Sequence, residues 1–303
     1  MSDEKKPLVG VLAIQGAFEE HQACLEASGC RTKQIRTVAD MTADGEALDG
    51  MVLPGGESTA MGLIGTSTKE KDGKNVWEAL RDFIEVEKKP TWGTCAGMIL
   101  LAERCVGASA VIQDGQALIG GMDILVCRNY FGSQVSSFEM ATPPPPASSS
   151  DNETTESAYP GVFIRAPAIL SAGRDVTVLG KVVATPCRQA AVVLEELERK
   201  IEKGEMVVQM GVVDALERKD SQIRYRAVVK PSASETGEEK KELSVEEHGP
   251  SIELPGAADG SNAREVICAV QRNNLLCTAF HPELTNDYRW HQYFTQMVKN
   301  NMA

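Results

Sequence analysis

Excess positive charge and long apolar runs are both missing from this 303-residue sequence. Its 31 Lys and Arg stand against 43 Asp and Glu, a formal net charge of −12. Nucleic-acid-binding surfaces rely on clustered basic residues, so we do not expect nucleic acid as a partner. The first apolar run, residues 8–14, is too short for a signal peptide or a membrane span. We therefore expect a soluble, cytosolic protein with no membrane partner.

Closely spaced cysteines are missing as well. None of the eight cysteines is part of a C-x-x-C pair, which argues against a zinc site and against a redox dithiol. We expect most of them to be reduced, buried and inert. Histidine is scarce, with four residues in the whole chain, so a search for a general base can proceed by elimination. We expect no metal site.

The first half of the chain alternates short apolar runs with helical patterns. This alternation is typical of a parallel sheet covered by helices on both faces, so the predicted fold class is α/β. The predicted strands cover residues 8–14, 48–53 and 90–92, and the predicted helices cover 17–28, 77–86 and 96–105. Late in the chain, residues 266–270 and 275–280 flank a polar tetrapeptide and predict a β-hairpin.

Two segments interrupt this pattern. Residues 141–159 contain four consecutive prolines followed by Ser, Asn, Thr and Glu, which favours an extended, mobile linker. Residues 195–263 begin with a charged helical pattern at 195–203 and end in a Ser-, Glu- and Lys-rich tail, from about 231 to 262, that we expect to be disordered. Between them, 206–213 and 222–229 have the pattern of a pair of strands.

The sequence Gly-Thr-Cys-Ala-Gly at residues 93–97 has the form G-x-C-x-G between a short strand and an apolar helix. Such a nucleophile elbow lifts its central side chain onto a helix N-terminus, where a thiolate is stabilised. The alternative interpretation is a buried cysteine beside two turn glycines. The strand–turn–helix context favours Cys95 as a nucleophile, and the other seven cysteines lack that context.

A thiol nucleophile needs a general base, and His281 is the candidate that elimination leaves. Three histidines are interpreted as surface or core-edge imidazoles: His21, His248 and His291. His281 directly follows the apolar run 275–280, at the edge where open parallel sheets carry functional groups. On an extended segment, Glu283 points to the same side and can orient the imidazole. A solvated turn is the alternative for His-Pro-Glu taken alone.

A third motif, PGGEST at residues 54–59, ends the strand predicted at 48–53. Taken alone, its two glycines form a generic turn or a phosphate-binding nest. The order PGGES, G-x-C-x-G, H-P-E, however, resembles a class I glutamine amidotransferase. With GTCAGM, RNYFGSQVSSFE, GVFIRAP and FHPELT, the chain closely resembles the glutaminase subunits of pyridoxal 5'-phosphate synthases.

The resemblance implies a three-layer sandwich with a mostly parallel central sheet, in one domain, 1–303, with insertions at 141–159 and 195–263. It also implies a role for each residue of the motifs. The triad would be Cys95, His281 and Glu283; the glutamine site would be Gly56, Glu57, Ser58, Arg128, Ile164 and Arg165; the oxyanion hole would use the N–H groups of Gly56 and Ala96; and Gln15 and Gly16 would meet the synthase partner.

The implied activity is hydrolysis of glutamine to glutamate and ammonia, with the ammonia delivered to a barrel-shaped synthase subunit. Pyridoxal phosphate would then be a product of the complex, and this subunit would need no cofactor. Three alternatives remain open. They are an amidotransferase subunit of another pathway, such as imidazole glycerol phosphate or anthranilate synthesis, a catalytically silent regulatory subunit, and a stress protein that also carries an elbow cysteine. The residues 96–98 and the RNYFGSQ segment argue against the first, and an intact triad argues against the second.

Overall fold

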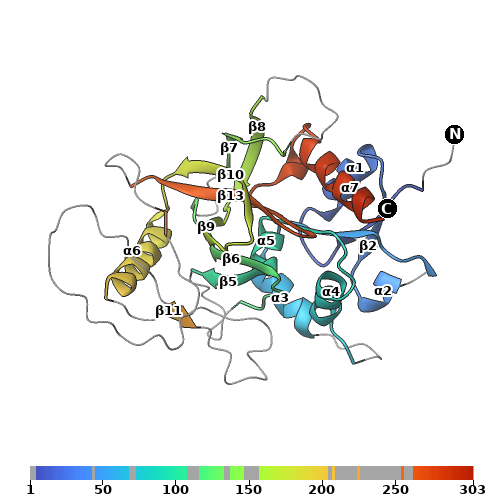
Figure 1. The fold of residues 1–303 in the computed structure, drawn as a ribbon, viewed down its shortest axis with the longest axis horizontal. Coiled ribbons are helices and arrows are strands. Elements are labelled where there is room, and N and C mark those ends of the chain that lie inside the picture. The colour runs from blue at the N-terminus through green and yellow to red at the C-terminus, as the bar shows by residue number, and fades with distance from the viewer. Residues whose placement is uncertain are drawn as a thin grey trace.

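A ten-stranded sheet organises the part of the chain that the structure, a computed structural model, describes (Figure 1). The described residues are 5–42, 45–67, 73–107, 116–132, 137–146, 157–203, 207–208, 224–225, 254–255 and 262–302. The strands of this sheet are β1 Leu8–Leu12, β2 Arg31–Ile35, β3 Gly50–Leu53, β4 Thr91–Thr94, β5 Ala102–Val106, β6 Met122–Cys127, β9 Ala168–Ala172, β10 Thr177–Ala184, β13 Arg264–Arg272 and β14 Leu275–Thr278. Their order is β2-β1-β3-β4-β14-β13-β9-β6-β5, and β10 pairs with β13.

The half of the sheet from β2 to β14 is parallel throughout. Strands β1, β3, β4 and β14 are buried along their whole length, as expected for apolar strands covered on both faces. The polar strand β2 forms the edge. Because parallel strands end at one edge of a sheet, the segments that follow β1, β3, β4 and β14 lie close together there. The three sequence motifs follow β3, β4 and β14.

Helices cover both faces of this sheet (Figure 1). On the face to which Trp92 points lie α1 and α7, and on the face to which Gly93 points lies α5, with α3 against it. These layers confirm the α/β fold class. The helices are α1 Phe18–Ala27, α2 Val38–Thr42, α3 Ser58–Ser67, α4 Val76–Glu85, α5 Ala96–Leu101, α6 Arg188–Glu202 and α7 Arg289–Met302, with a 3-10 turn, η3, at Pro282–Leu284. Within the described ranges, none of them has the length and apolarity that crossing a membrane requires.

The late hairpin has the predicted form, whereas the helix predicted at 96–105 is too long. Strands β13 and β14 pair from Arg272 and Leu275 outward, so the turn consists of Asn273 and Asn274, with Asn273 at a positive φ of 51°. Helix α5 ends at Leu101, and strand β5 begins at once with Ala102. The apolar run continues across that boundary, so its hydrophobicity did not reveal where helix gives way to strand.

The first predicted insertion connects two paired strands. β7, Ser137–Thr142, and β8, Tyr159–Ile164, form an antiparallel hairpin whose last pair joins Thr142 to Tyr159. Residues 141, 142 and 159 therefore belong to strands, and the predicted boundaries of the linker were too wide. These residues belong to strands because β7 pairs with β8, and the composition of a segment does not show such pairing. Residues 147–156 lie outside the described residues.

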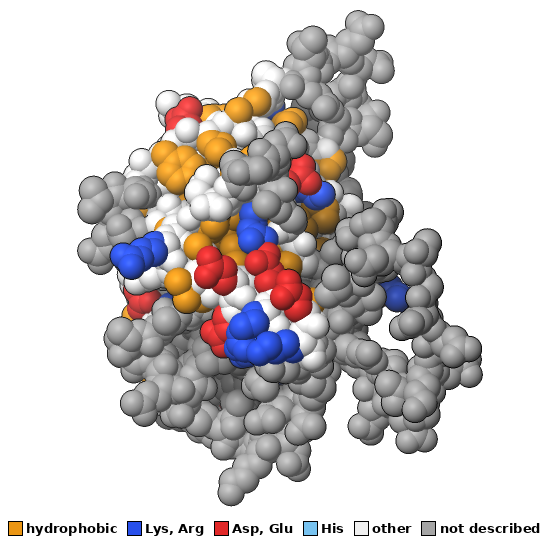
Figure 2. Space-filling model, turned by 90° about the vertical axis from the view of Figure 1, so that its left-hand side faces the viewer, with side chains coloured by type: hydrophobic (Ala, Val, Ile, Leu, Met, Phe, Trp, Pro, Cys, Tyr) orange, Lys and Arg blue, Asp and Glu red, His pale blue; other side chains and the backbone are white. Residues whose placement is uncertain are grey.

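The second predicted insertion is described only in part. Helix α6 begins at Arg188, ahead of the predicted 195, and an ion pair of 2.5 Å between Glu198 and Arg264 ties it to β13. The short strands β11, Val207–Val208, and β12, Arg224–Tyr225, pair within the two ranges predicted as strands. Most of the tail at 231–262 lies outside the described residues. Figure 2, seen from the side of α6, shows acidic and basic side chains next to one another.

Candidate active site

Cys95 occupies a strained turn between β4 and α5. Its φ of 46° and ψ of −102° are unfavourable for a residue with a side chain. The two glycines of the motif allow the close packing around this turn. A Cβ at Gly93 would lie 2.5 Å from the carbonyl group of Gly97, and a Cβ at Gly97 would overlap the carbonyl oxygen of Leu53. The predicted nucleophile elbow therefore has the required geometry, with Cys95 at the start of α5.

His281 follows β14, the neighbour of β4, so the ends of these two strands bring it beside Cys95. The Cys95 N–H donates to the carbonyl oxygen of Thr278 at 2.8 Å, which joins the two strand ends. The imidazole and the Cys95 side chain line the same cavity, and the Cys95 thiolate acts on the imidazole to raise its pKa. Its Nδ1 lies 2.7 Å from Oε1 of Glu283. Nucleophile, imidazole and carboxylate thus form one connected series.

The backbone that carries His281 and Glu283 is a 3-10 turn, and the prediction of an extended segment was wrong. Pro282 begins this turn, which its fixed φ favours. The Leu284 N–H donates to the His281 carbonyl at 3.3 Å, closing it. The two side chains still meet, with 2.7 Å between Nδ1 of His281 and Oε1 of Glu283. Periodicity gave the correct contact for an incorrect reason.

The charges within this series stabilise one another. Burial alone would lower the pKa of His281, but the Cys95 thiolate and then Glu283 raise it well above its usual value. Burial alone would raise the pKa of Glu283, but His21 and then His281 lower it well below the usual range. The site therefore favours an imidazolium at His281 beside an ionised Glu283, and a cysteine nucleophile requires such a cationic partner.

A cavity of about 230 Å³ opens over Cys95. Ten residues predicted for the site line it: Gln15, Gly56, Glu57, Ser58, Cys95, Ala96, Arg128, Ile164, Arg165 and His281. Glu283 lies behind His281, 5% exposed, and Gly16 is not part of the lining. Three lining residues were not predicted: Ile99, Asn129 and Pro167. Each lies within four positions of a predicted residue, so helical spacing and motif adjacency were the signals that could have found them.

Backbone strain is concentrated around this cavity. In the described part of the chain, five residues other than glycine have positive φ, and three of them line the cavity: Cys95, Asn129 and Arg165. Such conformations cost about 1–3 kcal/mol each and persist only where the surrounding structure holds them. Arg165 follows directly after β8, in the separate two-stranded sheet, and Asn129 shortly after β6, so both the hairpin and the main sheet contribute to the site.

Arg128 places a positive charge in the cavity wall. The residue is 8% exposed, and its Nη2 donates to Oγ1 of Thr59 at 2.9 Å. Glu57 lies 3.7 Å from the same guanidinium nitrogen, and its carboxylate accepts the N–H groups of Thr59 and Ala60, at 3.1 and 2.7 Å, in the first turn of α3. Burial would raise the pKa of Glu57, but these hydrogen bonds and Arg128 lower it. Both side chains are therefore held in their charged forms.

The glycine turn after β3 packs against the segment after β1. The Ala17 N–H donates to the Gly55 carbonyl at 3.3 Å, and the Glu57 N–H donates to Oε1 of Gln15 at 2.6 Å. A Cβ at Gly16 would overlap the Gly55 carbonyl oxygen, so this contact requires glycine. The predicted partner-binding residues, Gln15 and Gly16, thus contact the predicted oxyanion turn directly.

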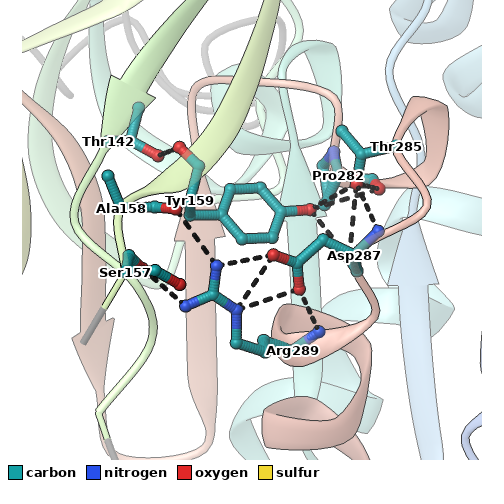
Figure 3. Close-up of polar contacts among 8 residues, drawn as sticks. All are labelled: Thr142, Ser157, Ala158, Tyr159, Pro282, Thr285, Asp287 and Arg289. Atoms are coloured by element: carbon teal, nitrogen blue, oxygen red, sulfur yellow. Dashed lines mark hydrogen bonds and ion pairs between the residues drawn. The ribbon is translucent and has the colours of Figure 1, made fainter. Parts of the chain in front are cut away.

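A cluster around Tyr159 fixes the turn that carries the triad (Figure 3). The buried Tyr159 hydroxyl lies 2.9 Å from Oγ1 of Thr285 and 3.1 and 3.3 Å from the carbonyl oxygens of Asp287 and Pro282. Arg289 pairs with Asp287 at 2.6 Å and also donates to the carbonyls of residues 157 and 158. Strand β8, whose other end reaches the cavity, is thereby tied to the His-Pro-Glu turn.

Two of the remaining histidines are buried next to the triad, and the prediction that they are surface or core-edge residues was wrong. His21 and His291 both have 0% exposure. They lie on the buried faces of α1 and α7, and no local pattern in the sequence specifies that these two faces meet behind Glu283. His248 lies outside the described residues.

The other cysteines fit the prediction of inert thiols. All eight cysteines are free, and every one except Cys187 is buried. Burial raises the pKa of Cys24 to about 11 and of Cys105, Cys127 and Cys268 to about 12. Thiols with such pKa values are weak nucleophiles at neutral pH. Within the described ranges, no group of three or more His, Cys, Asp or Glu side chains is placed to hold a metal ion.

Comparison with known proteins defines the class. Residues 11–196 match the model of the SNO glutamine amidotransferase family. A solved structure described as a glutamine amidotransferase superposes with a TM-score of 0.56 at 24% identity, covering 96% of this chain and 98% of that one, which shows the common fold. The chain belongs to the SNO glutamine amidotransferase family.

Similar curated proteins narrow the comparison. The chain is 37% identical to the "Probable pyridoxal 5'-phosphate synthase subunit PDX2" of Arabidopsis thaliana, over 96% of this chain and 86% of that protein. It is 31% identical to the pyridoxal 5'-phosphate synthase subunit PdxT of Kineococcus radiotolerans, over 98% of this chain and 97% of that protein. The resemblance inferred from the motifs is therefore confirmed over nearly the full length.

Proposed function

We propose that this chain is the glutaminase subunit of a pyridoxal 5'-phosphate synthase. Relatives that match nearly the whole chain are named as pyridoxal 5'-phosphate synthase subunits, and the family of this chain is that of SNO glutamine amidotransferases. The observation that carries the proposal is the connected series Cys95, His281 and Glu283 at the base of a cavity with a buried arginine in its wall. A catalytically silent subunit would have no need for this geometry.

The proposed reaction begins with the Cys95 thiolate, which attacks the side-chain carboxamide carbon of glutamine. The C=O π bond becomes an oxyanion as the S–C bond forms. The oxyanion would be held by the N–H groups of Gly56 and Ala96, and such donors contribute roughly 3–4 kcal/mol each in comparable sites. Ala96 is the first residue of α5, so its N–H has no acceptor within the helix.

Collapse of this intermediate breaks the C–N bond. The His281 imidazolium gives its proton to the departing nitrogen, and ammonia leaves. The neutral imidazole then takes a proton from water, whose oxygen attacks the γ-glutamyl thioester. Glutamate leaves as the S–C bond breaks, and the thiolate is restored. Glu283 holds Nδ1 of His281 through both half-reactions, so that the other ring nitrogen serves Cys95.

Charged groups in the cavity wall suit the remainder of the substrate. We assign the α-carboxylate of glutamine to the guanidinium of Arg128, because Arg128 is buried and pairs with oxygen acceptors there. Ile164 and Arg165, with the backbone around Glu57 and Ser58, would enclose the substrate backbone and side chain. This assignment leaves the carboxamide at the Cys95 end of the cavity.

Ammonia is mostly protonated at neutral pH and is then not nucleophilic, so direct delivery to a second active site is required. We propose that the acceptor is the barrel-shaped synthase subunit and that Gln15 and Gly16 contribute to the contact. Their packing against the turn of Gly55 and Gly56 supports this, because a partner at that loop lies next to the oxyanion site.

Eight unpaired thiols support a cytosolic location.

The decisive experiment measures glutamate release from glutamine with and without the synthase subunit. We expect turnover in the presence of the partner and no measurable turnover for Cys95→Ala. Cys187→Ala is the matched control, because Cys187 is the one cysteine of the chain that is not fully buried. Equal glutamate release by wild type and Cys95→Ala would contradict the triad. If the synthase subunit neither binds this chain nor stimulates its glutamate release, the assigned partner is contradicted.

We further propose that residues 1–303 form one domain with two insertions, the first between the ends of β7 and β8, within the predicted 141–159, and the second at 195–263. The pairing of Thr142 with Tyr159 supports this, because it brings the ends of the first insertion together. Replacing residues 147–156 by Gly-Asn-Gly should leave kcat unchanged within about twofold, since the hairpin ends and the Arg289 contacts remain. A large fall in kcat would show that the insertion shapes the active site.

A further inference from the structure

Behind the triad, two buried imidazoles continue the polar series away from the cavity. His21, from α1, places Nε2 at 3.2 Å from Oε2 of Glu283 and at 3.1 Å from Oγ1 of Thr94. Its Nδ1 lies 3.1 Å from Nε2 of His291, from α7. Each imidazole ring lies edge-on to Trp92, with centroids 5.6 Å apart for His21 and 5.0 Å apart for His291. The two imidazole rings are tilted against each other, with centroids 5.2 Å apart. Side chains from α1, β4 and α7 therefore form one cluster behind Glu283.

The two oxygens of the Glu283 carboxylate have different neighbours. Oε1 lies against Nδ1 of His281, at 2.7 Å. Oε2 is buried, and among the described residues its polar neighbour is His21. That contact does not meet the geometry of a hydrogen bond, whereas the same nitrogen of His21 hydrogen-bonds the Thr94 hydroxyl at 3.1 Å. The interaction of His21 with Oε2 is thus mainly electrostatic, and it occurs where no water competes.

A carboxylate in such a place needs a second partner. Glutamate has three rotatable side-chain bonds, and a single contact at Oε1 leaves the carboxylate free to rotate about that contact. Burying an ionised oxygen without a compensating group is costly. His21 supplies the compensating group at Oε2, and His291 holds His21 from its far side. The protein therefore fixes the orientation of Glu283 from two directions.

We propose that His21 is a positioning residue of the glutaminase reaction: by holding Oε2 of Glu283, it keeps Oε1 aligned with Nδ1 of His281 and so directs the other imidazole nitrogen toward Cys95. This inference rests on the proposed glutaminase function and adds a group to it that does not touch glutamine. Loss of His21 should therefore reduce kcat, through misalignment of the base, and leave KM for glutamine nearly unchanged.

Two substitutions of His21 separate its two contacts. His21→Gln can place an amide N–H near the position of Nε2, facing Glu283, and His21→Asn can place one near Nδ1, facing His291 only. Measured as glutamate release in the complex with the synthase subunit, we expect His21→Asn to lower kcat by about 10- to 100-fold, because small displacements of a catalytic group have effects of that size. His21→Gln should recover most of that loss. KM should stay within about twofold of wild type in both variants.

A second comparison uses Glu283→Gln as background. If His21 acts through Glu283, His21→Asn should lower kcat by a much smaller factor in the Glu283→Gln background than in wild type, because Glu283→Gln has already removed the interaction. The proposal would be overturned if His21→Asn lowered kcat by the same factor in both backgrounds. It would also be overturned if kcat were as low in His21→Gln as in His21→Asn. Should His21→Asn not fold, His21→Gln decides by itself, because a kcat more than about tenfold below wild type for His21→Gln would overturn the proposal. If wild type and Cys95→Ala release glutamate equally, the proposed function itself fails, which is a different result.

Discussion

The imidazole of His281 lies directly against Gly55, so closely that a Cβ on residue 55 would overlap the ring. The PGGES turn is therefore also the surface on which the catalytic base rests. Glycine is required at position 55 because a side chain there would occupy the space of the His281 ring. The next residue, Gly56, lines the cavity together with His281.

Gly55→Ala should therefore abolish activity without unfolding the protein. The added methyl group must displace the His281 ring, and overpacking of this kind costs about 1–3 kcal/mol. We expect glutamate release to fall at least about 100-fold, since small displacements of catalytic groups have effects of that size. Gly29→Ala is the control: Gly29 has a φ of +93° and open space around it, so it should lose stability but retain activity. Full activity of Gly55→Ala would contradict the contact.

Arg128→Gln should raise KM for glutamine by about 10- to 100-fold and change kcat only severalfold, because a charged hydrogen bond to the substrate carboxylate is lost. Steady-state kinetics in the complex would measure this. Thr59→Val is the matched control, since it removes a hydroxyl that holds Arg128 but not the charge. A change confined to kcat, or a larger effect of Thr59→Val than of Arg128→Gln, would argue against the substrate assignment.

Glu283 should contribute to stability in a pH-dependent way. Its pKa lies below the ordinary value of 4.5, despite burial, because of His21 and His281. A lowered native pKa gives stability that is present above the unfolded-state value and is lost as pH falls through the native value. The difference in unfolding free energy between wild type and Glu283→Gln should thus be about 3–5 kcal/mol at neutral pH and narrow below pH 4.5.

Urea unfolding at several pH values would measure that difference. Glu265→Gln serves as the control, because Glu265 forms an exposed ion pair with Lys181 and should change stability by at most about 1 kcal/mol. A gap between wild type and Glu283→Gln that stays constant down to acidic pH would mean that the carboxylate is not stabilised by its neighbours.

Tyr159→Phe should destabilise the His-Pro-Glu turn. The substitution removes a buried hydroxyl that contacts Thr285 and two carbonyl oxygens, so we expect a loss of about 1–3 kcal/mol in unfolding free energy. Tyr293→Phe is a fitting control, since its hydroxyl bonds Gln271 in a half-buried position outside this cluster. Equal losses for the two variants would show that the Tyr159 cluster has no special part in holding the turn.

Much of the site could be predicted because its residues are local to strand ends. Cys95 follows its short strand directly, His281 comes three residues after its strand, and the G-x-C-x-G spacing describes a turn of a few residues. The hairpin of β13 and β14 was equally accessible, because two apolar runs flanked a short polar turn. In each case the determining interactions span a few positions, and local sequence contains them.

Other features depend on contacts between distant segments. The boundary between α5 and β5 falls inside one apolar run, and only the pairing of β5 with β6 makes Ala102 the start of a strand. The ends of the first insertion likewise belong to strands because β7 pairs with β8. Hydrophobicity alone does not distinguish a buried helix from a buried strand, so these boundaries were set by tertiary structure.

The sequence by itself determined the fold class, the family motifs and the three residues of the proposed triad, since each follows from spacing within a short segment. Only the tertiary structure decided that His21 and His291, 270 positions apart, meet in the core behind Glu283. Periodicity identifies the buried face of a helix but not the group that this face meets. That choice depends on how α1 and α7 pack across β4, which is a property of the whole fold.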